Sequence, residues 1–182
     1  MHILVTRRLT MRPPLEVDLE PIAAAIGDWE VSRWLGTVPH PYTLDDASHW
    51  YEHMERGPGD RRWTLHDVTG FCGVVSLRMH ADGADGPELG YWLARARWGQ
   101  GLMSEAVRGV LVDHFHRDGG SVMSGAQEAN VASLRVQSKM GFEPAGTLRR
   151  ASQALGQDVT ILRTRLERRA FEQRFPRKDM AA

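Results

Sequence analysis

Apolar and polar positions along the first half of the chain predict short strands interrupted by two helices. The alternation from Val5 to Arg12 indicates a strand, which ends at Pro13 because proline cannot donate a hydrogen bond to a strand ladder. Leu19–Ile26 and Thr43–Met54 show the spacing of amphipathic helices, and Thr43 is a typical N-cap. The remaining strands expected in this half are Trp63–His66, Phe71–Met79 and Glu88–Leu93.

The second half predicts one long helix followed by further strands and a shorter helix. The buried face of the long helix comprises Met103, Val107, Val110, Leu111 and Phe115, and Gly119 and Gly120 end it. The later elements are expected at Ser121–Ala126 (strand), Asn130–Met140 (helix), Phe142–Leu148 and Val159–Arg165 (strands). Together these elements predict an α+β fold in a single domain over residues 1–182, with residues from about 168 to 182 as a tail. We expect helices on both faces of a mixed sheet.

The segment from Glu88 to Ala106 is the most informative part of the sequence, because it places a glycine turn between a strand and a helix. Gly99 and Gly101 allow the backbone to approach a bulky anion closely. The following helix offers unpaired N–H groups and the positive end of its dipole. These features suit a pyrophosphate, although a tight turn without a ligand is the simpler alternative.

Two nucleotide-binding motifs explain this loop less well. A Rossmann site needs a third small residue, which Ser104 supplies, and an acid after the second strand of the first βαβ unit. Glu128 follows the next expected strand, but it lies rather far away and several strands precede the loop. A Walker loop needs Gly-Lys followed by Ser or Thr, and the sequence contains no such triplet.

A second motif begins at Asn130, about thirty residues after the glycine turn, and reads Asn-Val-Ala-Ser-Leu-Arg-Val-Gln-Ser-Lys-Met-Gly-Phe. Asn130 is a natural N-cap and Gly141 a natural helix end. Together with Trp-Gly-Gln-Gly at residues 98–101, this helix resembles the GNAT superfamily of N-acetyltransferases, and most closely its RimJ/RimL-like branch. Arg8–Pro13 looks like the family's opening strand. The resemblance implies a twisted, mostly antiparallel sheet of about seven strands.

The resemblance also implies acetyl-CoA as the co-substrate. In the family the glycine loop cradles the pyrophosphate, and the second helix lies beside the pantetheine arm and the leaving thiol. The residues expected to bind acetyl-CoA are Tyr91, Trp92, Leu93, Trp98, Gly99, Gln100, Gly101, Leu102, Met103, Ser104, Asn130 and Ser133. Met103 stands where the family usually has alanine or glycine, and Gln137 stands where many members have a tyrosine acid.

Glu88 and Ser133 are the candidate catalytic residues. Glu88 opens the strand before the loop, and strands of this kind carry the general base in many GNAT enzymes. Ser133 would donate a hydrogen bond to the leaving thiolate, while His80 and Glu128 are weaker candidate bases. The simpler interpretations are a surface carboxylate at a strand end and a serine that only caps its helix.

The implied reaction is direct attack of a primary amine on the thioester, with backbone N–H groups of the 88–93 strand as oxyanion donors. The acceptor is a protein N-terminal amine or a small-molecule amine, and Val31–Gly36 and Pro41–Thr43 resemble the family's variable acceptor-side helices. Deprotonation at pH 7 costs about 1.4 kcal/mol for an α-amine and about 4.6 kcal/mol for lysine. A weakly placed base therefore favours an α-amine. A non-catalytic acyl-CoA-binding sensor is the alternative function.

The amino-acid composition limits the classes of binding partner that we expect. The 182 residues include 23 basic and 23 acidic side chains, so nothing indicates bulk attraction to nucleic acid or to an anionic membrane. The arginine-rich stretch from Arg163 to Lys178 is expected to be a solvated strand face and a frayed tail. Cys72 is the one cysteine and lies in a buried-strand pattern, which indicates a core thiol. Without a signal peptide or spanning segment, we expect a cytoplasmic monomer or homodimer.

His49, Glu52 and His53 match the inverted zinc-protease signature His-x-x-Glu-His. The two histidines lie four residues apart and could share a metal. A zinc hydrolase would need a further ligand and a large catalytic domain. The expected assignment is therefore a solvated helix face and no metal.

Overall fold

The computed structural model describes residues 2–54, 59–79, 86–117 and 119–176. Eight strands form one sheet in the order β1-β2-β3-β4-β5-β6-β8-β7. The strands are β1 (Leu4–Val5), β2 (Thr10–Arg12), β3 (Arg61–Asp67), β4 (Gly70–Arg78), β5 (Glu88–Leu93), β6 (Val122–Gln127), β7 (Glu143–Ser152) and β8 (Gln157–Leu166). The α-helices are α1 (Leu19–Gly27), α2 (Trp29–Ser32), α3 (Leu44–Glu52), α4 (Leu102–His116), α5 (Val131–Met140) and α6 (Arg168–Arg174). Short 3-10 turns, η1 (Glu16–Asp18) and η2 (Arg95–Arg97), precede α1 and α4.

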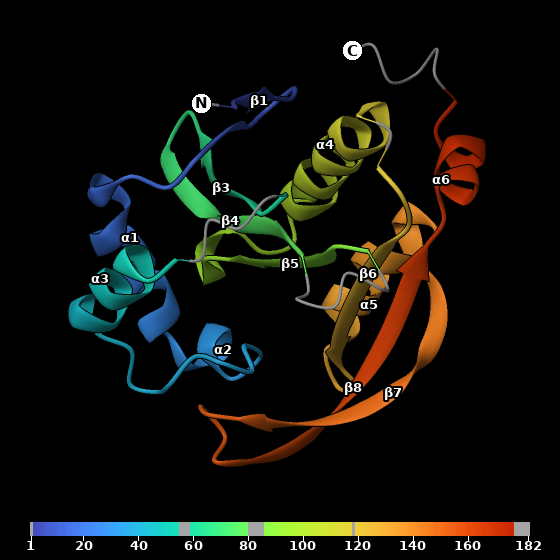
Figure 1. Cartoon of the computed structure of the whole chain (residues 1–182). Coiled ribbons are helices and arrows are strands. Elements are labelled where there is room, and N and C mark those ends of the chain that lie inside the picture. Colours follow the sequence, from blue (N-terminus) through green and yellow to red (C-terminus); the bar gives the residue numbers. More distant parts are fainter. Residues whose placement is uncertain (1, 55–58, 80–85, 118, 177–182) are drawn as a thin grey trace.

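The sheet is mixed and mostly antiparallel, as predicted. Only β5 and β6 pair in parallel among the described strands, and the other neighbours are antiparallel. Alternate side chains of β4 enter two separate cores. Val75 and Leu77 pack with α4 and α6, whereas Val74 packs with α1 and α3. Helices therefore cover both faces, and Figure 1 shows α4 on one side of the central strands with α1 and α3 on the other.

The N-terminal segment from Val5 to Arg12 is a hairpin, so the prediction of a single strand there is wrong. Thr6 turns the chain, since its amide donates to the Leu9 carbonyl at 2.9 Å and its hydroxyl accepts from the Leu9 amide at 3.2 Å. β1 then folds back on β2 with Val5 opposite Thr10. This extra strand raises the count to eight, against the expected seven.

The expected tail begins with a helix. Phe171 of α6 is fully buried, with its ring centroid 5.2 Å from that of Phe115 on α4 and 5.0 Å from that of Phe175. Arg168 donates to the Phe115 carbonyl at 2.7 Å. The expectation of a frayed, solvated tail is thus wrong for α6, where aromatic side chains four residues apart anchor the arginine-rich segment to the core.

Two further findings concern the single cysteine and the length of the helices. Cys72 is fully buried, and this burial raises the pKa of its thiol, in agreement with a core residue. Among the described residues no helix is both long and apolar enough to cross a membrane.

Candidate active site

The site begins where β5 and β6 separate. The two strands pair only at Glu88 with Met123 and at Leu89 with Ser124. From Gly90 to Leu93, β5 continues to pair with β4 on its other edge but no longer with β6. The edge of β5 that faces β6 therefore keeps backbone groups available for a ligand.

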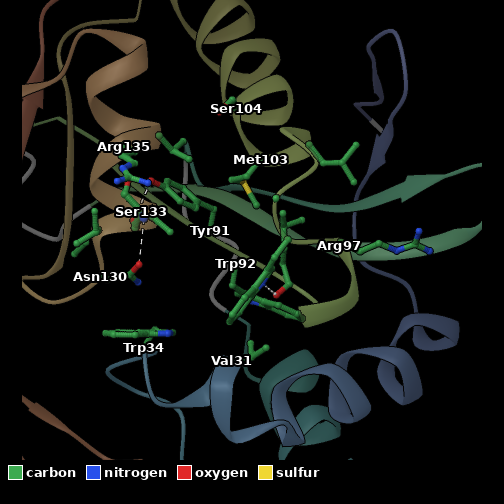
Figure 2. Close-up of a pocket in the computed structure, with 18 of the residues that line it drawn as sticks. Val31, Trp34, Tyr91, Trp92, Arg97, Met103, Ser104, Asn130, Ser133 and Arg135 are labelled. Atoms are coloured by element: carbon green, nitrogen blue, oxygen red, sulfur yellow. Dashed lines mark hydrogen bonds between the residues drawn. The ribbon is translucent and has the colours of Figure 1, made fainter.

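A cavity of about 580 Å³ opens at this separation. It lies between β5, the glycine turn, the N-terminus of α4 and the first turns of α5, with α2 at its other end. Figure 2 shows Asn130, Ser133 and Arg135 on one side of it, Trp92 on β5, and Val31 and Trp34 at the α2 end. The size suits a small-molecule or cofactor site.

The glycine turn has the backbone conformation that the sequence predicts. Gly99 and Gly101 have φ values of 74° and 75°, in the left-handed region that favours glycine. Trp98 supports the turn, because its indole N–H donates to the Leu93 carbonyl at 2.9 Å. Gly101 precedes α4, a 15-residue helix, so the first N–H groups of that helix lie beside the cavity.

A clamp from the N-terminal hairpin holds the same turn. Glu105, in the first turn of α4, accepts hydrogen bonds from the Thr6 hydroxyl, the Arg8 amide and the Arg8 Nε, each at 2.7 Å. Arg8 Nη1 in turn donates to the Gln100 carbonyl at 2.9 Å. These bonds hold the pKa of the Glu105 carboxyl below its usual value against the opposing effect of burial. The clamp ties the turn between Gly99 and Gly101 to the sheet.

A hydrogen-bonded chain of side chains joins the cavity wall to the core beneath α5. Asn130 caps α5 by accepting from the Ser133 amide at 3.1 Å. The Ser133 hydroxyl donates to the Tyr91 phenol oxygen at 3.0 Å, and the Tyr91 hydroxyl donates to the Ser133 carbonyl at 3.0 Å. Gln137 Nε2 lies 3.4 Å from Ser133 Oγ, and Thr164 donates to Gln137 Oε1 at 2.8 Å.

Tyr91 therefore supplies a hydroxyl where position 137 has none. Burial raises the pKa of the Tyr91 phenol, which keeps it protonated at neutral pH. Gln137 is 1% exposed and lies beneath Ser133, outside the cavity lining. The phenol hydroxyl bonded to Ser133 belongs to strand β5.

A family model described as the Acetyltransferase (GNAT) domain matches residues 8–143 of this chain. The chain belongs to the GNAT acetyltransferase family. It is 32% identical over 154 residues to the uncharacterized protein YkkB of Bacillus subtilis (strain 168), covering 81% of this chain and 88% of YkkB. As a GNAT acetyltransferase it is an acetyl-CoA-dependent acyltransferase.

Solved structures share the GNAT fold at low sequence identity. RimL, a ribosomal L7/L12 alpha-N-protein acetyltransferase in complex with coenzyme A, superimposes with a TM-score of 0.77 at 18% identity, covering 91% of this chain and 98% of RimL. Spermidine N-acetyltransferase from Vibrio cholerae, in complex with CoA and spermine, gives a TM-score of 0.75 at 16% identity, covering 91% and 99%.

Most of the residues predicted to bind acetyl-CoA lie together in this GNAT cavity. Those that line it are Tyr91, Trp92, Leu93, Trp98, Gly99, Gly101, Leu102, Met103, Ser104, Asn130 and Ser133. Gln100 does not line it, and its side chain instead donates to the Ala96 carbonyl at 3.0 Å. Met103 is 6% exposed and packs in the core below the loop, which accounts for a larger residue there.

The predicted base Glu88 lies outside the cavity lining, at the end of β5 where β5 still pairs with β6. Its carboxylate is 3.8 Å from Arg78 on β4. A strand alternates direction at each residue and advances about 3.3 Å per residue, so sequence proximity to the loop does not bring Glu88 to the cavity. Glu128 does not line the cavity either, and His80 lies outside the described residues.

Charged side chains that were not among the predicted binding residues also line the cavity, although Arg33 belongs to the expected acceptor-side segment Val31–Gly36. Arg135 and Lys139 line the cavity one helical turn apart on α5, a spacing that a helical projection of the second motif would have revealed. Glu30 and Arg33 line its α2 end. Arg97 borders the cavity, but its side chain points away from it and lies 3.2 Å from Asp67.

His49 on α3 and His53 just after it have ring centroids 4.0 Å apart with an interplanar angle of 30°, away from the GNAT cavity. Within the described part of the chain, no group of three or more His, Cys, Asp or Glu side chains is arranged to hold a metal ion.

Proposed function

We propose that this protein transfers the acetyl group of acetyl-CoA to a primary amine, either a protein N-terminal amine or a small-molecule amine. The observation that carries the proposal is the cavity between β5 and β6, which has the glycine turn at one end and the hydroxyls of Tyr91 and Ser133 in its wall. RimL and the spermidine enzyme share this fold and, by their names, acetylate acceptors of these two kinds.

The residues of the cavity fit acetyl-CoA chemically. The turn at Gly99 and Gly101 and the free N–H groups at the start of α4 suit a pyrophosphate. The open edge of β5 from Gly90 to Leu93 suits the amide groups of a pantetheine arm. Arg135 and Lys139 bring two positive charges to the lining, where they favour phosphate groups.

Bound acetyl-CoA supplies a thioester whose carbonyl carbon accepts the amine. Backbone N–H groups on the open edge of β5 stabilise the negative charge that develops on the carbonyl oxygen, an effect worth about 3 kcal/mol. The sulfur leaves as a thiolate, and the Ser133 hydroxyl, once it turns from the Tyr91 oxygen 3.0 Å away, donates a hydrogen bond to it. We therefore assign Ser133 the role of hydrogen-bond donor to the leaving thiolate and Tyr91 the role of positioning Ser133.

Deprotonation of the amine receives little help from the cavity. Among the described residues that line it, Glu30 is the only carboxylate, and there is no histidine. An α-amine has a pKa near 8 and loses its proton at pH 7 for about 1.4 kcal/mol, so it suits this site better than a lysine side chain, which costs about 4.6 kcal/mol. We therefore infer an α-amine or a similarly acidic amine as acceptor.

The test is release of free CoA from acetyl-CoA with a panel of amines, combined with the thermal shift that acetyl-CoA produces. An enzyme gives a thermal shift and amine-dependent CoA release. The second candidate, an acyl-CoA-binding sensor, is favoured by the scarcity of groups in the described lining that could act as a general base; it gives the thermal shift without CoA release. A lysine peptide as the best acceptor would contradict the inferred α-amine, and the absence of any thermal shift would contradict both functions.

A further inference from the structure

The α2 end of the cavity carries an arginine in an unusual setting. Arg33 follows the four-residue helix α2 and lines the cavity together with Trp34. Its backbone carbonyl accepts a hydrogen bond at 2.9 Å from the side chain of Gln127 on β6, a strand that borders the cavity. Arg33 is therefore fixed to the same framework as the proposed acetyl-CoA site.

The guanidinium of Arg33 has hydrogen-bonding capacity to spare. Its Cζ atom lies 4.5 Å from the centre of the Trp34 ring, and its Nη2 is 3.6 Å from the Glu30 carboxylate, beyond hydrogen-bonding distance. Its Nε is buried and has no hydrogen-bond partner among the described residues. A buried donor without a partner is unfavourable, so a small rotation that lets the guanidinium bind a carboxylate is favourable.

Charge at this end argues against a polycationic acceptor. Glu30 is the only carboxylate among the described lining residues, and Arg33 balances it. A polyamine needs surplus negative charge in its pocket, whereas an arginine fork matches the geometry of a carboxylate.

The walls of this end favour a compact acceptor. The loop after α2 is tied to the end of β7 through a hydrogen bond from the Gln153 amide to the Gly36 carbonyl at 3.0 Å. Figure 1 shows the β7–β8 hairpin reaching back beneath α2. The cavity of about 580 Å³ must also hold the pantetheine arm, and the indoles of Trp34 and Trp92 line the remainder.

We propose that the acceptor is a small amine that also carries a carboxylate, of the amino-acid type with an apolar body, and that Arg33 binds this carboxylate. The inference rests on the proposed acetyl transfer and names its substrate class. Arg33 is then a specificity-determining residue that orients the amine toward the thioester.

The experiment compares amines that differ only in the carboxylate: phenylalanine with phenethylamine, methionine with 3-(methylthio)propylamine, and tryptophan with tryptamine. Spermidine and a serine-initiated tetrapeptide represent the other two acceptor classes. Each is assayed by CoA release with the parent, Arg33→Met, Arg33→Lys and the control Arg149→Met, an exposed arginine that pairs with Asp158 at 3.8 Å outside the cavity.

We expect kcat/KM for the carboxylate-bearing amine to fall about tenfold to a hundredfold in Arg33→Met, while that for the decarboxylated partner stays unchanged. Each ratio compares the same amine in two proteins, so differences in amine pKa cancel. Arg33→Lys should recover only part of the loss because lysine lacks the fork. Arg149→Met should behave as the parent.

Calorimetry of N-acetylphenylalanine and N-acetylphenethylamine with parent and Arg33→Met adds a readout that does not depend on turnover. The parent should bind the carboxylate compound more tightly, and the variant should bind both alike. Equal losses for both partners, or spermidine or the tetrapeptide as the best acceptor, would overturn the inference while leaving acetyl transfer intact. Failure of acetyl transfer itself appears separately, as no CoA release with any amine.

Discussion

The two ends of the cavity are built by different means. At the proposed acetyl-CoA end, most of the proposed contacts come from main-chain groups, namely the turn at Gly99 and Gly101, the first N–H groups of α4 and the open edge of β5. At the α2 end, the lining is made of side chains, with Arg33, Trp34 and Glu30 most prominent.

The main-chain contacts are of the kind that a whole family can share, whereas the side-chain contacts are of the kind that can differ between its members. Main-chain contacts depend on backbone conformation and tolerate many side chains, provided that glycine stays where φ is positive. Side-chain contacts change with a single substitution. A fold match therefore supports acetyl-CoA as donor but leaves the acceptor to be argued from the α2 end.

The largest effect is expected where the two ends meet, at Ser133 and Tyr91. Ser133→Ala should lower kcat by about 10²-fold with little change in acetyl-CoA affinity, because one positioned hydrogen-bond donor at a developing charge contributes about 10²–10³-fold. Tyr91→Phe removes the phenol that is 3.0 Å from the Ser133 hydroxyl. Because the two groups act together, the double variant should be no worse than the more damaged single variant. Steady-state kinetics with a thermal-shift measurement of acetyl-CoA binding tests this.

The pH profile adds a check on the same pair. Burial raises the pKa of Tyr91, so the folded protein keeps this proton longer than the unfolded chain does. The protonated Tyr91 phenol contributes fully to the free energy of unfolding below the unfolded pKa of about 10. This contribution is lost as the pH rises through the pKa of the folded state. Tyr91 should therefore cause no fall in kcat below about pH 10.

The outcome that contradicts the Ser133 prediction is unchanged turnover in Ser133→Ala. That result would leave Ser133 with only a structural role in α5.

The main-chain end is tested by Gly101→Asp. The substitution places a carboxylate where we expect phosphate and strains a residue with φ of 75°. Saturation at a hundredfold Kd should stabilise the parent by about 2.7 kcal/mol, and the variant should lose this gain. Gly146→Asp is the matched control, since Gly146 has φ of 105° and open space but lies on β7 outside the cavity lining. A normal acetyl-CoA shift in Gly101→Asp would remove the turn from the site.

The contrast between main-chain and side-chain contacts also explains which features of the site can be predicted from the sequence. Gly99, Gly101, Asn130 and Gly141 carry their backbone roles in their residue types, and the structure confirms the conformations predicted for them. The helix at the start of the expected tail could not be predicted because the arginines around Phe171 obscured its aromatic spacing. The local motifs place Tyr91 at the cofactor end and Arg33 at the acceptor end, but their contacts with Ser133 and Gln127 join residues distant in sequence, which no local pattern indicates.

A smaller effect is expected from the clamp that supports the main-chain end. Arg8→Met removes the hydrogen bond to the Gln100 carbonyl and the pairing with Glu105. A hydrogen bond from a charged group is worth about 1.5–3 kcal/mol, and part of it is lost to solvent because Arg8 is exposed. We expect KM for acetyl-CoA to rise about tenfold with kcat nearly unchanged. Arg165→Met, which breaks an exposed pair with Glu167 at 2.7 Å, is the matched control. An equal fall in kcat would show that the clamp positions the chemistry as well.

The smallest effect is expected at Glu88, and it distinguishes nearness in sequence from nearness in space. Glu88 shares β5 with Tyr91 and Trp92, yet it lies at the paired end of the strand, outside the cavity lining, with Arg78 at 3.8 Å. Glu88→Gln should therefore change kcat/KM by less than about twofold, and loss of a partly exposed ion contact should cost about 0–1 kcal/mol of stability. The measurement is kcat/KM for the best acceptor from pH 6 to about pH 9, the range in which loss of a general base lowers the rate. A large fall that grows toward low pH would restore Glu88 as the base, acting through water from the closed end of the strands, and would make β5 the source of proton transfer on both sides of the reaction.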